Sequence, residues 1–146
     1  MVKTISKWKQ NVFCLLVLLC VTRVDACGEL TPCETFFKLG KIKSITVSKA
    51  WASGKARNET SLNCHNFYLT KALVQYYFKR TGQITENANH YATPSSPCYA
   101  SGMLQTVSGD KAEWYIGVFG EGELRGFRGR DVYLYCSKCK APPFIQ

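Results

Sequence analysis

Six cysteines between residue 27 and the end of the chain constrain its fold more than any other feature. An even number of cysteines in a secreted chain predicts a disulfide framework, here of three bonds whose pairing the sequence does not rank. We expect Cys136 and Cys139 each to bond to a different part of the chain. A redox motif or half a zinc site would also fit C-x-x-C, but no second C-x-x-C is present. The expected disulfide-forming residues are Cys27, Cys33, Cys64, Cys98, Cys136 and Cys139.

The first 26 residues predict a secretory signal peptide. Lys3, Lys7 and Lys9 precede the apolar run 12–21, and Val24-Asp25-Ala26 offers a cleavage site with small residues. The apolar run is about half the roughly 20 residues that a membrane-spanning helix needs. We therefore expect residues 27–146 to form one secreted, extracellular domain without a membrane partner.

The composition of that domain limits the classes of function. The signal peptide holds four basic residues and one acidic residue, so its removal lowers the formal net charge from +9 to about +6. The aromatic content of 13% is enough for a packed core, which argues against disorder. The length predicts one domain rather than a multidomain enzyme, and secretion argues against a nucleic-acid partner.

A glycosylation sequon lies in the first half of the domain. Asn58-Glu59-Thr60 matches N-x-T, and the secretory pathway makes such a site usable. A glycan needs an exposed acceptor, so we predict that residues 52–62 form a polar surface loop carrying a glycan at Asn58.

Hydrophobic patterns predict an antiparallel all-β protein of about five to eight short strands. One strand begins after Gly40, and another covers 99–107 and ends at a Ser-Gly-Asp turn. The firmest local prediction is a hairpin that joins 114–119 to 132–136, with turn glycines supplied by 120–123.

The segment 67–80 fits two kinds of element. Leu69, Leu73, Tyr76 and Tyr77 follow a helical stripe, but the aromatic and β-branched content favours a strand. A turn is then expected at 81–83, and polar residues with two prolines predict a loop over 87–97. If 67–80 is a helix, the alternative fold is α+β, with one helix on an antiparallel sheet.

No pattern of catalytic residues emerges, so we expect a protein that is not an enzyme, with neither cofactor nor metal. Nucleophilic catalysis needs a base beside an activated Ser or Cys, and only His65 and His90 could serve. Each fits a structural or solvated role better. Glu121 and Glu123 could form an acid/base pair, but they fall in the expected hairpin turn, where solvation leaves carboxylates unperturbed.

Two groups of residues are candidates for binding. A closed barrel of about eight strands encloses space for one small ligand, which aromatic side chains could line. A short basic cluster near the second hairpin strand could bind a sulfated glycan or an acidic protein surface. The candidate ligand-binding residues are Trp51, Tyr76, Trp114 and Tyr133, and the candidate anion-binding residues are Arg125, Arg128 and Arg130.

The order of these parts resembles a lipocalin, of the divergent salivary type found in blood-feeding arthropods. The resemblance rests on Phe36-Phe37-Lys38-Leu39-Gly40-Lys41-Ile42 entering a first strand, on a glycosylatable loop before Cys64, and on the late strand Val132-Tyr133-Leu134-Tyr135-Cys136. It implies a small antiparallel β-barrel, cross-linked by disulfides and secreted in saliva. Such a barrel sequesters a small hydrophobic or amine ligand, for example a host inflammatory or haemostatic mediator.

A second function class stays open beside this one. A disulfide-rich interaction protein without an internal cavity would inhibit or capture a host protein or a sulfated glycan through exposed loops. A helix at 67–80 packed on the sheet would favour this second class.

Overall fold

The computed structural model describes residues 33–53, 64–94 and 97–145. They form a mostly β structure with two short α-helices and one 3-10 turn. In chain order the elements are β1 (Thr35–Phe36), β2 (Ile42–Ser53), η1 (Cys64–Asn66), α2 (Lys71–Phe78), β3 (Gly82–Ile84), α3 (Glu86–Tyr91), β4 (Cys98–Thr106), β5 (Lys111–Gly117), β6 (Glu121–Phe127) and β7 (Arg130–Tyr135).

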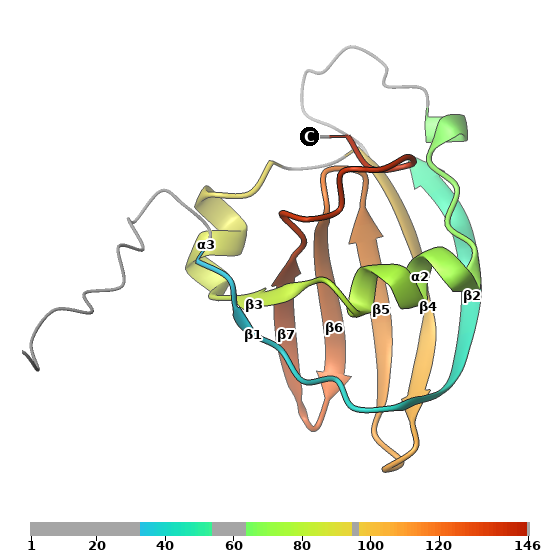
Figure 1. The fold of residues 1–146 in the computed structure, drawn as a ribbon, viewed down its shortest axis with the longest axis vertical. Coiled ribbons are helices and arrows are strands. Elements are labelled where there is room, and N and C mark those ends of the chain that lie inside the picture. Colours follow the sequence, from blue (N-terminus) through green and yellow to red (C-terminus); the bar gives the residue numbers. More distant parts are fainter. Residues whose placement is uncertain (1–32, 54–63, 95–96, 146) are drawn as a thin grey trace, which may run out of the picture.

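The strands form one antiparallel sheet in the order β1-β3-β7-β6-β5-β4-β2. The antiparallel β architecture is therefore confirmed, but the predicted closed barrel is not found. β1 and β2 are the two edges of the sheet and do not pair with each other across the described residues. Figure 1 shows the curved sheet with α2 lying across one face, which we call the inner face. This layout corresponds to the alternative expectation of a helix on an antiparallel sheet.

The predicted strands are confirmed for β2 and β4, and those at 114–119 and 132–136 are confirmed in approximate position as β5 and β7. β2 begins at Ile42, just after Gly40, and β4 ends at Thr106 before the expected turn. The predicted hairpin between 114–119 and 132–136 is wrong, because β6 lies between β5 and β7 and pairs with both. β6 buries Leu124 and Phe127, but the glutamates and glycines of this strand hid its alternating pattern.

The prediction of a strand over 67–80 is also wrong, because Lys71–Phe78 form the helix α2. Thr70 caps the helix, since its hydroxyl accepts a hydrogen bond from the backbone N–H of Leu73 at 3.3 Å. The helix buries Val74, Tyr77 and Phe78 against the sheet. Burial of one apolar stripe therefore outweighs the β propensity of the individual residues.

The loop predicted over 87–97 is partly wrong as well. Residues 86–91 form α3, whose cap Thr85 accepts a hydrogen bond from the N–H of Ala88 at 3.1 Å. The turn expected at 81–83 is replaced by β3, which pairs with β1 on one side and β7 on the other. Both predictions failed because short polar elements carry a weak hydrophobic pattern.

Glycines let α2 approach the inner face of the sheet. A β-carbon on Gly122 would meet the hydroxyl of Tyr77, which donates a hydrogen bond to the carbonyl of Gly120 at 3.1 Å. On β4, Gly102 serves the sheet itself, because a β-carbon there would collide with the backbone carbonyl of Thr46 on β2 and with the ring of Trp114. Phe144 from the C-terminal segment stacks on Tyr77 with ring centroids 6.0 Å apart. Helix, sheet and tail thus form one hydrophobic core that fills the inner face.

Candidate functional site

A groove lies beside α2, where the connection from β1 to β2 passes the helix. We call it the α2 groove; its volume is about 600 Å³. In Figure 1 the connection runs along the lower margin of the sheet, below α2. The groove is lined by residues 36–42, by Gln75 and Phe78 of the helix and by its C-cap residue Lys79.

Local interactions position the connection that forms one wall of this groove. Leu39 is buried in the core, and Phe37 packs edge-on against Phe127 of β6 with centroids 6.0 Å apart. Gly40 has φ +88°, a conformation that L side chains rarely adopt, and it turns the chain toward β2. The carbonyl of Lys41 accepts a hydrogen bond from the N–H of Val107 at 2.8 Å, which ties the wall to β4.

The lining of the α2 groove is amphipathic. Phe37, Leu39, Ile42 and Phe78 are buried or half-buried and give the groove an apolar base. Its lysines, Lys38, Lys41 and Lys79, are all exposed. A molecule with an apolar body and an anionic head matches this arrangement of side chains.

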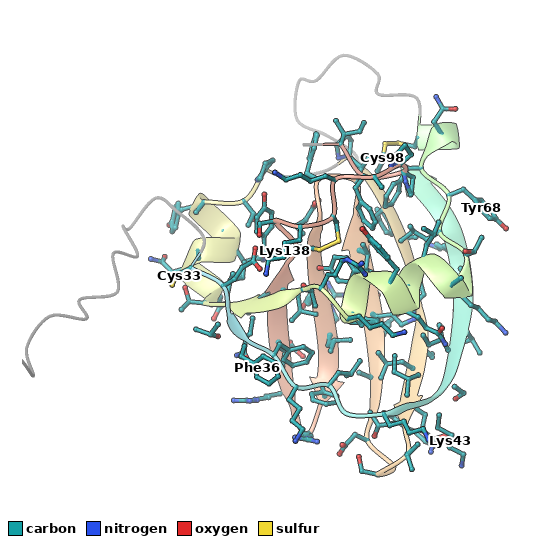
Figure 2. All side chains as sticks on the ribbon, in the orientation of Figure 1. Cys33, Phe36, Lys43, Tyr68, Cys98 and Lys138 are labelled. Atoms are coloured by element: carbon teal, nitrogen blue, oxygen red, sulfur yellow. A yellow bond between two sulfur atoms is a disulfide. The ribbon has the colours of Figure 1, made fainter. Side chains whose placement is uncertain are left out.

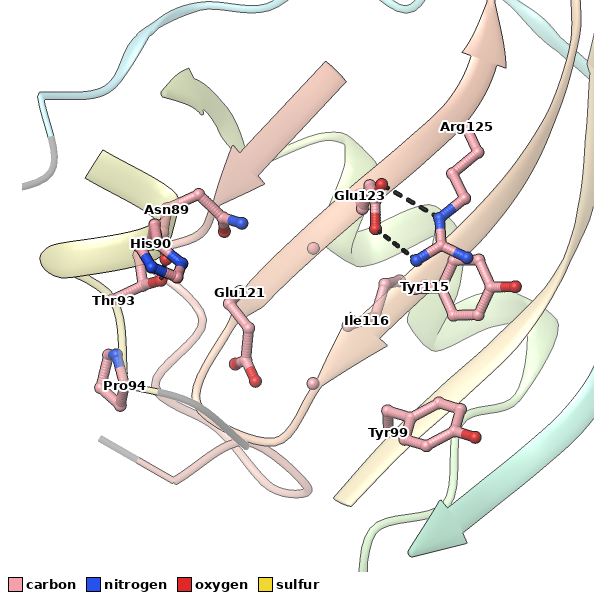
Figure 3. A pocket seen from close by; sticks show the side chains of 12 residues that line it. Asn89, His90, Thr93, Pro94, Tyr99, Tyr115, Ile116, Glu121, Glu123 and Arg125 are labelled. Atoms are coloured by element: carbon pink, nitrogen blue, oxygen red, sulfur yellow. Dashed lines mark hydrogen bonds and ion pairs between the residues drawn. The ribbon is translucent and has the colours of Figure 1, made fainter. Parts of the chain in front are cut away.

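A second groove lies on the opposite, outer face of the sheet. This outer groove has a volume of about 540 Å³ and runs between α3 and strands β4 to β6. Figure 3 shows Tyr99, Tyr115 and Arg125 on one side and the α3 residues Asn89 and His90 on the other. Its carboxylates come from Glu121 and Glu123, both on β6.

The charged groups of the outer groove are partly paired. The guanidinium of Arg125 donates two hydrogen bonds to the Glu123 carboxylate, each of 3.0 Å, and lies 4.2 Å from the centroid of the Tyr115 ring. A hydrogen bond with Glu113 and partial burial raise the pKa of Tyr115. This part of the groove already accommodates a cation between an aromatic face and a carboxylate.

Of the four residues predicted to bind a ligand, the three whose side chains are described do not come together. Trp114 is fully buried on the inner face, whereas Tyr133 lies half-buried on β7 with its ring on the outer face. Tyr76 is on α2, where the guanidinium of Arg80 covers its ring at 3.9 Å. Trp51 belongs to β2, and its side chain lies outside the described residues.

The positive charge of the predicted basic cluster is partly neutralised by carboxylates. Arg125 is paired with Glu123, and Arg128 forms an ion pair with Asp110 at 3.1 Å. Arg130 begins β7 and is exposed. The pairing of the first two with carboxylates reduces the positive potential available to a sulfated glycan.

The disulfide framework is confirmed in type and corrected in one pairing. Cys64 bonds to Cys98, and Cys33 is also disulfide-bonded. Cys136 bonds to Cys139, so the expectation that each reaches a different part of the chain is wrong. The chain turns directly after β7, where the N–H of Cys139 donates to the carbonyl of Cys136 at 3.2 Å. Cys27 lies outside the described residues.

The remaining candidate residues are the glycosylation site Asn58 and the two histidines. Asn58 and the side chain of His65 lie outside the described residues. His90 is exposed on α3, with its ring centroid 4.5 Å from that of Tyr91. Within the described part of the chain, no cluster of three or more His, Cys, Asp or Glu side chains could hold a metal ion.

Sequence reasoning missed the residues of the α2 groove. The lipocalin resemblance assigns the segment Phe36–Ile42 to the entry of a first strand, although its lysines alternate with apolar residues. That alternation was the available signal. Its meaning depends on α2, which supplies Phe78 and Lys79 from a distant part of the chain.

Comparison with known proteins adds no relative: no protein-family model, curated protein or solved structure matches the chain. In the part of the chain that the structure describes, no helix is long and apolar enough to cross a membrane. The fold and disulfides define a disulfide-linked, open antiparallel β-protein, and disulfides are typical of extracellular proteins.

Proposed function

We propose that this is a secreted binding protein that takes up a small amphipathic anion, such as a long-chain carboxylate, in the α2 groove. The observation that carries the proposal is the lining of this groove, where an apolar base meets three exposed lysines. Its volume of about 600 Å³ falls within the range of small-molecule sites. The predicted signal peptide and the disulfides support secretion.

The proposal keeps the role implied by the lipocalin resemblance and changes the place of the ligand. A salivary lipocalin would sequester a host mediator inside its barrel. Here α2 and Phe144 occupy the inner face, and both Tyr77 of the helix and Trp114 of β5 are fully buried. The ligand is therefore assigned to the margin of this core, where Phe37 and Phe78 remain accessible from the groove. The proposal includes no catalytic step.

Displacement of a fluorescent fatty acid from the purified protein tests the proposal. Gln75→Trp places a bulky side chain in the groove from an exposed helix position, and we expect at least a tenfold loss of affinity. Lys71→Trp is the matched control, because Lys71 is exposed on the same helix and does not line the groove. Absence of saturable binding, or equal affinity of the two variants, would contradict the proposal.

The lysines require a separate variant. Lys38→Glu, Lys41→Glu and Lys79→Glu together should weaken binding of a long-chain carboxylate, but not of the corresponding uncharged alcohol. The same reversals at Lys43, Lys49 and Lys111 form the control, since these lysines are exposed outside the groove. Equal losses from both triple variants would show that only the overall charge matters.

A second candidate function is capture of an amine, or of an arginine or lysine side chain of a partner protein, in the outer groove. The position of the Arg125 guanidinium on Tyr115, beside Glu123, favours it, because another cation could occupy the same type of site. The helix on the sheet also favours this interaction class. A titration with tyramine tests it: Tyr115→Ala should abolish binding, whereas Tyr133→Ala should not.

A further inference from the structure

An exposed aromatic residue surrounded by basic side chains lies next to the α2 groove. Phe36 ends the two-residue strand β1, and its side chain is 89% exposed. Figure 2 shows Phe36 and Lys138 on the same side of the molecule, along the β1 edge. We call this the Phe36 surface; its exposed basic residues are Lys38, Lys41, Lys79, Arg80 and Lys138.

The positive charge of the Phe36 surface is little neutralised within the described residues. The carboxylate among its lining residues is Glu34, whose Oε1 accepts a hydrogen bond from the backbone N–H of Ser137 at 2.8 Å. The guanidinium of Arg80 is positioned over the ring of Tyr76, and Lys138 lies between the bonded Cys136 and Cys139. Both cations are thus attached to well-defined parts of the fold.

The Phe36 surface is continuous with the α2 groove. A shallow hollow of about 390 Å³ is lined by residues 34–37, 79–82 and Lys138. It shares Phe36, Phe37 and Lys79 with the α2 groove. A partner that covers the hollow therefore also covers the entrance to the groove.

We infer that the Phe36 surface docks on an anionic lipid bilayer, with Phe36 inserted among the headgroups and the surrounding Lys and Arg side chains on lipid phosphates. An exposed aromatic ring enclosed by cations matches the boundary between acyl chains and headgroups. Basic side chains near an anionic membrane each contribute to attraction within a Debye length. A sulfated glycan would match the cations but would leave Phe36 without an apolar contact.

This inference rests on the proposed function and extends it. Long-chain carboxylates partition into bilayers, so docking would place the entrance of the groove where its ligand resides. The expectation of no membrane partner considered only membrane-spanning segments, and surface docking needs none. The inference thus assigns the protein a site of ligand uptake as well as a ligand class.

Sedimentation of the full protein with vesicles tests the inference. We expect binding to phosphatidylcholine vesicles that contain phosphatidylserine, little binding without it, and weaker binding as salt is raised. Phe36→Ser should weaken binding several-fold. Arg80→Glu with Lys138→Glu should weaken it at least about tenfold, because each cation near such a surface contributes roughly a factor of five. Lys43→Glu with Lys111→Glu is the matched control outside the surface.

The same variants separate this inference from the proposed function. Arg80 and Lys138 do not line the α2 groove, so their reversal should leave solution binding of the fatty acid unchanged. Gln75→Trp should lose the fatty acid and retain vesicle binding. The inference would be overturned if vesicle binding by the wild-type protein did not depend on phosphatidylserine. It would also be overturned if the protein bound heparin through Arg80 and Lys138 but did not bind vesicles. In either case, the proposed function would still be tested by the fatty-acid titration in solution, which does not involve vesicles.

Discussion

The two faces of the sheet have opposite characters although they alternate along the same strands. On β5, Trp114 faces inward and is fully buried, whereas the next residue, Tyr115, faces outward and is half-buried. On β6, Leu124 is fully buried between the outward-facing Glu123 and Arg125. The inner face is thus a packed core, and the outer face is a polar surface with aromatic rings and ion pairs.

The difference shows where binding can occur in this fold. α2 occupies the inner face, so the space that a closed barrel would leave for a ligand is filled by the protein's own side chains. The space outside this core includes the α2 groove at its margin and the outer groove. Substitutions on the inner face should therefore change stability, and those on the outer face should change it little.

The largest expected effect comes from adjacent residues on β5. Trp114→Ala should destabilise the fold by about 3–5 kcal/mol, because it leaves a large cavity beneath α2. The indole Nε1 has no hydrogen-bond partner among the described residues, so the loss is one of packing. Tyr115→Ala should cost only about 1 kcal/mol, mainly its contact with Arg125. Urea denaturation measures both values, and similar losses would mean that the two faces do not differ as described.

The two disulfides whose partners are both described should contribute unequally to stability. Cys64 and Cys98 are 34 residues apart and connect η1, just before α2, to β4, whereas Cys136 and Cys139 are 3 residues apart. In the chain-entropy model, replacing the first pair by alanine costs about 4 kcal/mol and the second about 2 kcal/mol. Thermal unfolding of the two double variants checks this order. A greater loss from the second pair would show that its local turn supports the core more than loop length predicts.

Alanine substitutions of two glycines, one on each face, compare how tightly the two faces of the sheet are packed. Gly122→Ala should destabilise the fold by about 1–3 kcal/mol, because the methyl group would press on the buried ring of Tyr77. Gly117→Ala should cost less, since its methyl group would meet the carboxylate end of the flexible Glu121 side chain. Comparison of their denaturant midpoints tests the account. Equal midpoints would contradict the close packing of Tyr77 of α2 against Gly122 of β6.

The smallest effect concerns an exposed ion pair. Hydrogen bonds from Ser108 and then Arg128 lower the pKa of Asp110 below its ordinary value of 3.8. The ionised group therefore stabilises the fold above that value, and this contribution is lost as the pH falls through the lowered pKa. The Asp110→Asn variant should be less stable than the wild type at about pH 6. On acidification to about pH 2, the variant should lose less stability than the wild type does. An unchanged acid dependence would show that the pair is too solvated to matter.

Strands whose apolar residues alternate cleanly could be predicted from sequence, including β5 and β7, but β1, β3, β6 and the two helices could not. β2 and β4 carry β-branched or alternating apolar residues; β2 begins just after Gly40, and β4 ends before the turn that contains Gly109. β6 was missed because Gly122 and the charges around Leu124 indicate a turn. The reason for Gly122 is the Tyr77 ring of a distant helix, which no local pattern reveals.

The helix and the candidate site were hidden for a related reason. Tyr76, Tyr77 and Phe78 have β propensity, and only the sheet beneath them makes a helical stripe the better choice. The α2 groove needs both Phe37 and Phe78, which are far apart in the chain. The cysteines were recognisable as disulfide-forming, but the pairing of Cys136 with Cys139 depends on the turn after β7.

Amide-resolved NMR during titration with a long-chain fatty acid tests the central claim most directly. The account predicts saturable shifts in residues 36–42 and 75–79 and little change around Tyr99 and Tyr115. It would be contradicted by no shifts, or by shifts confined to the outer groove.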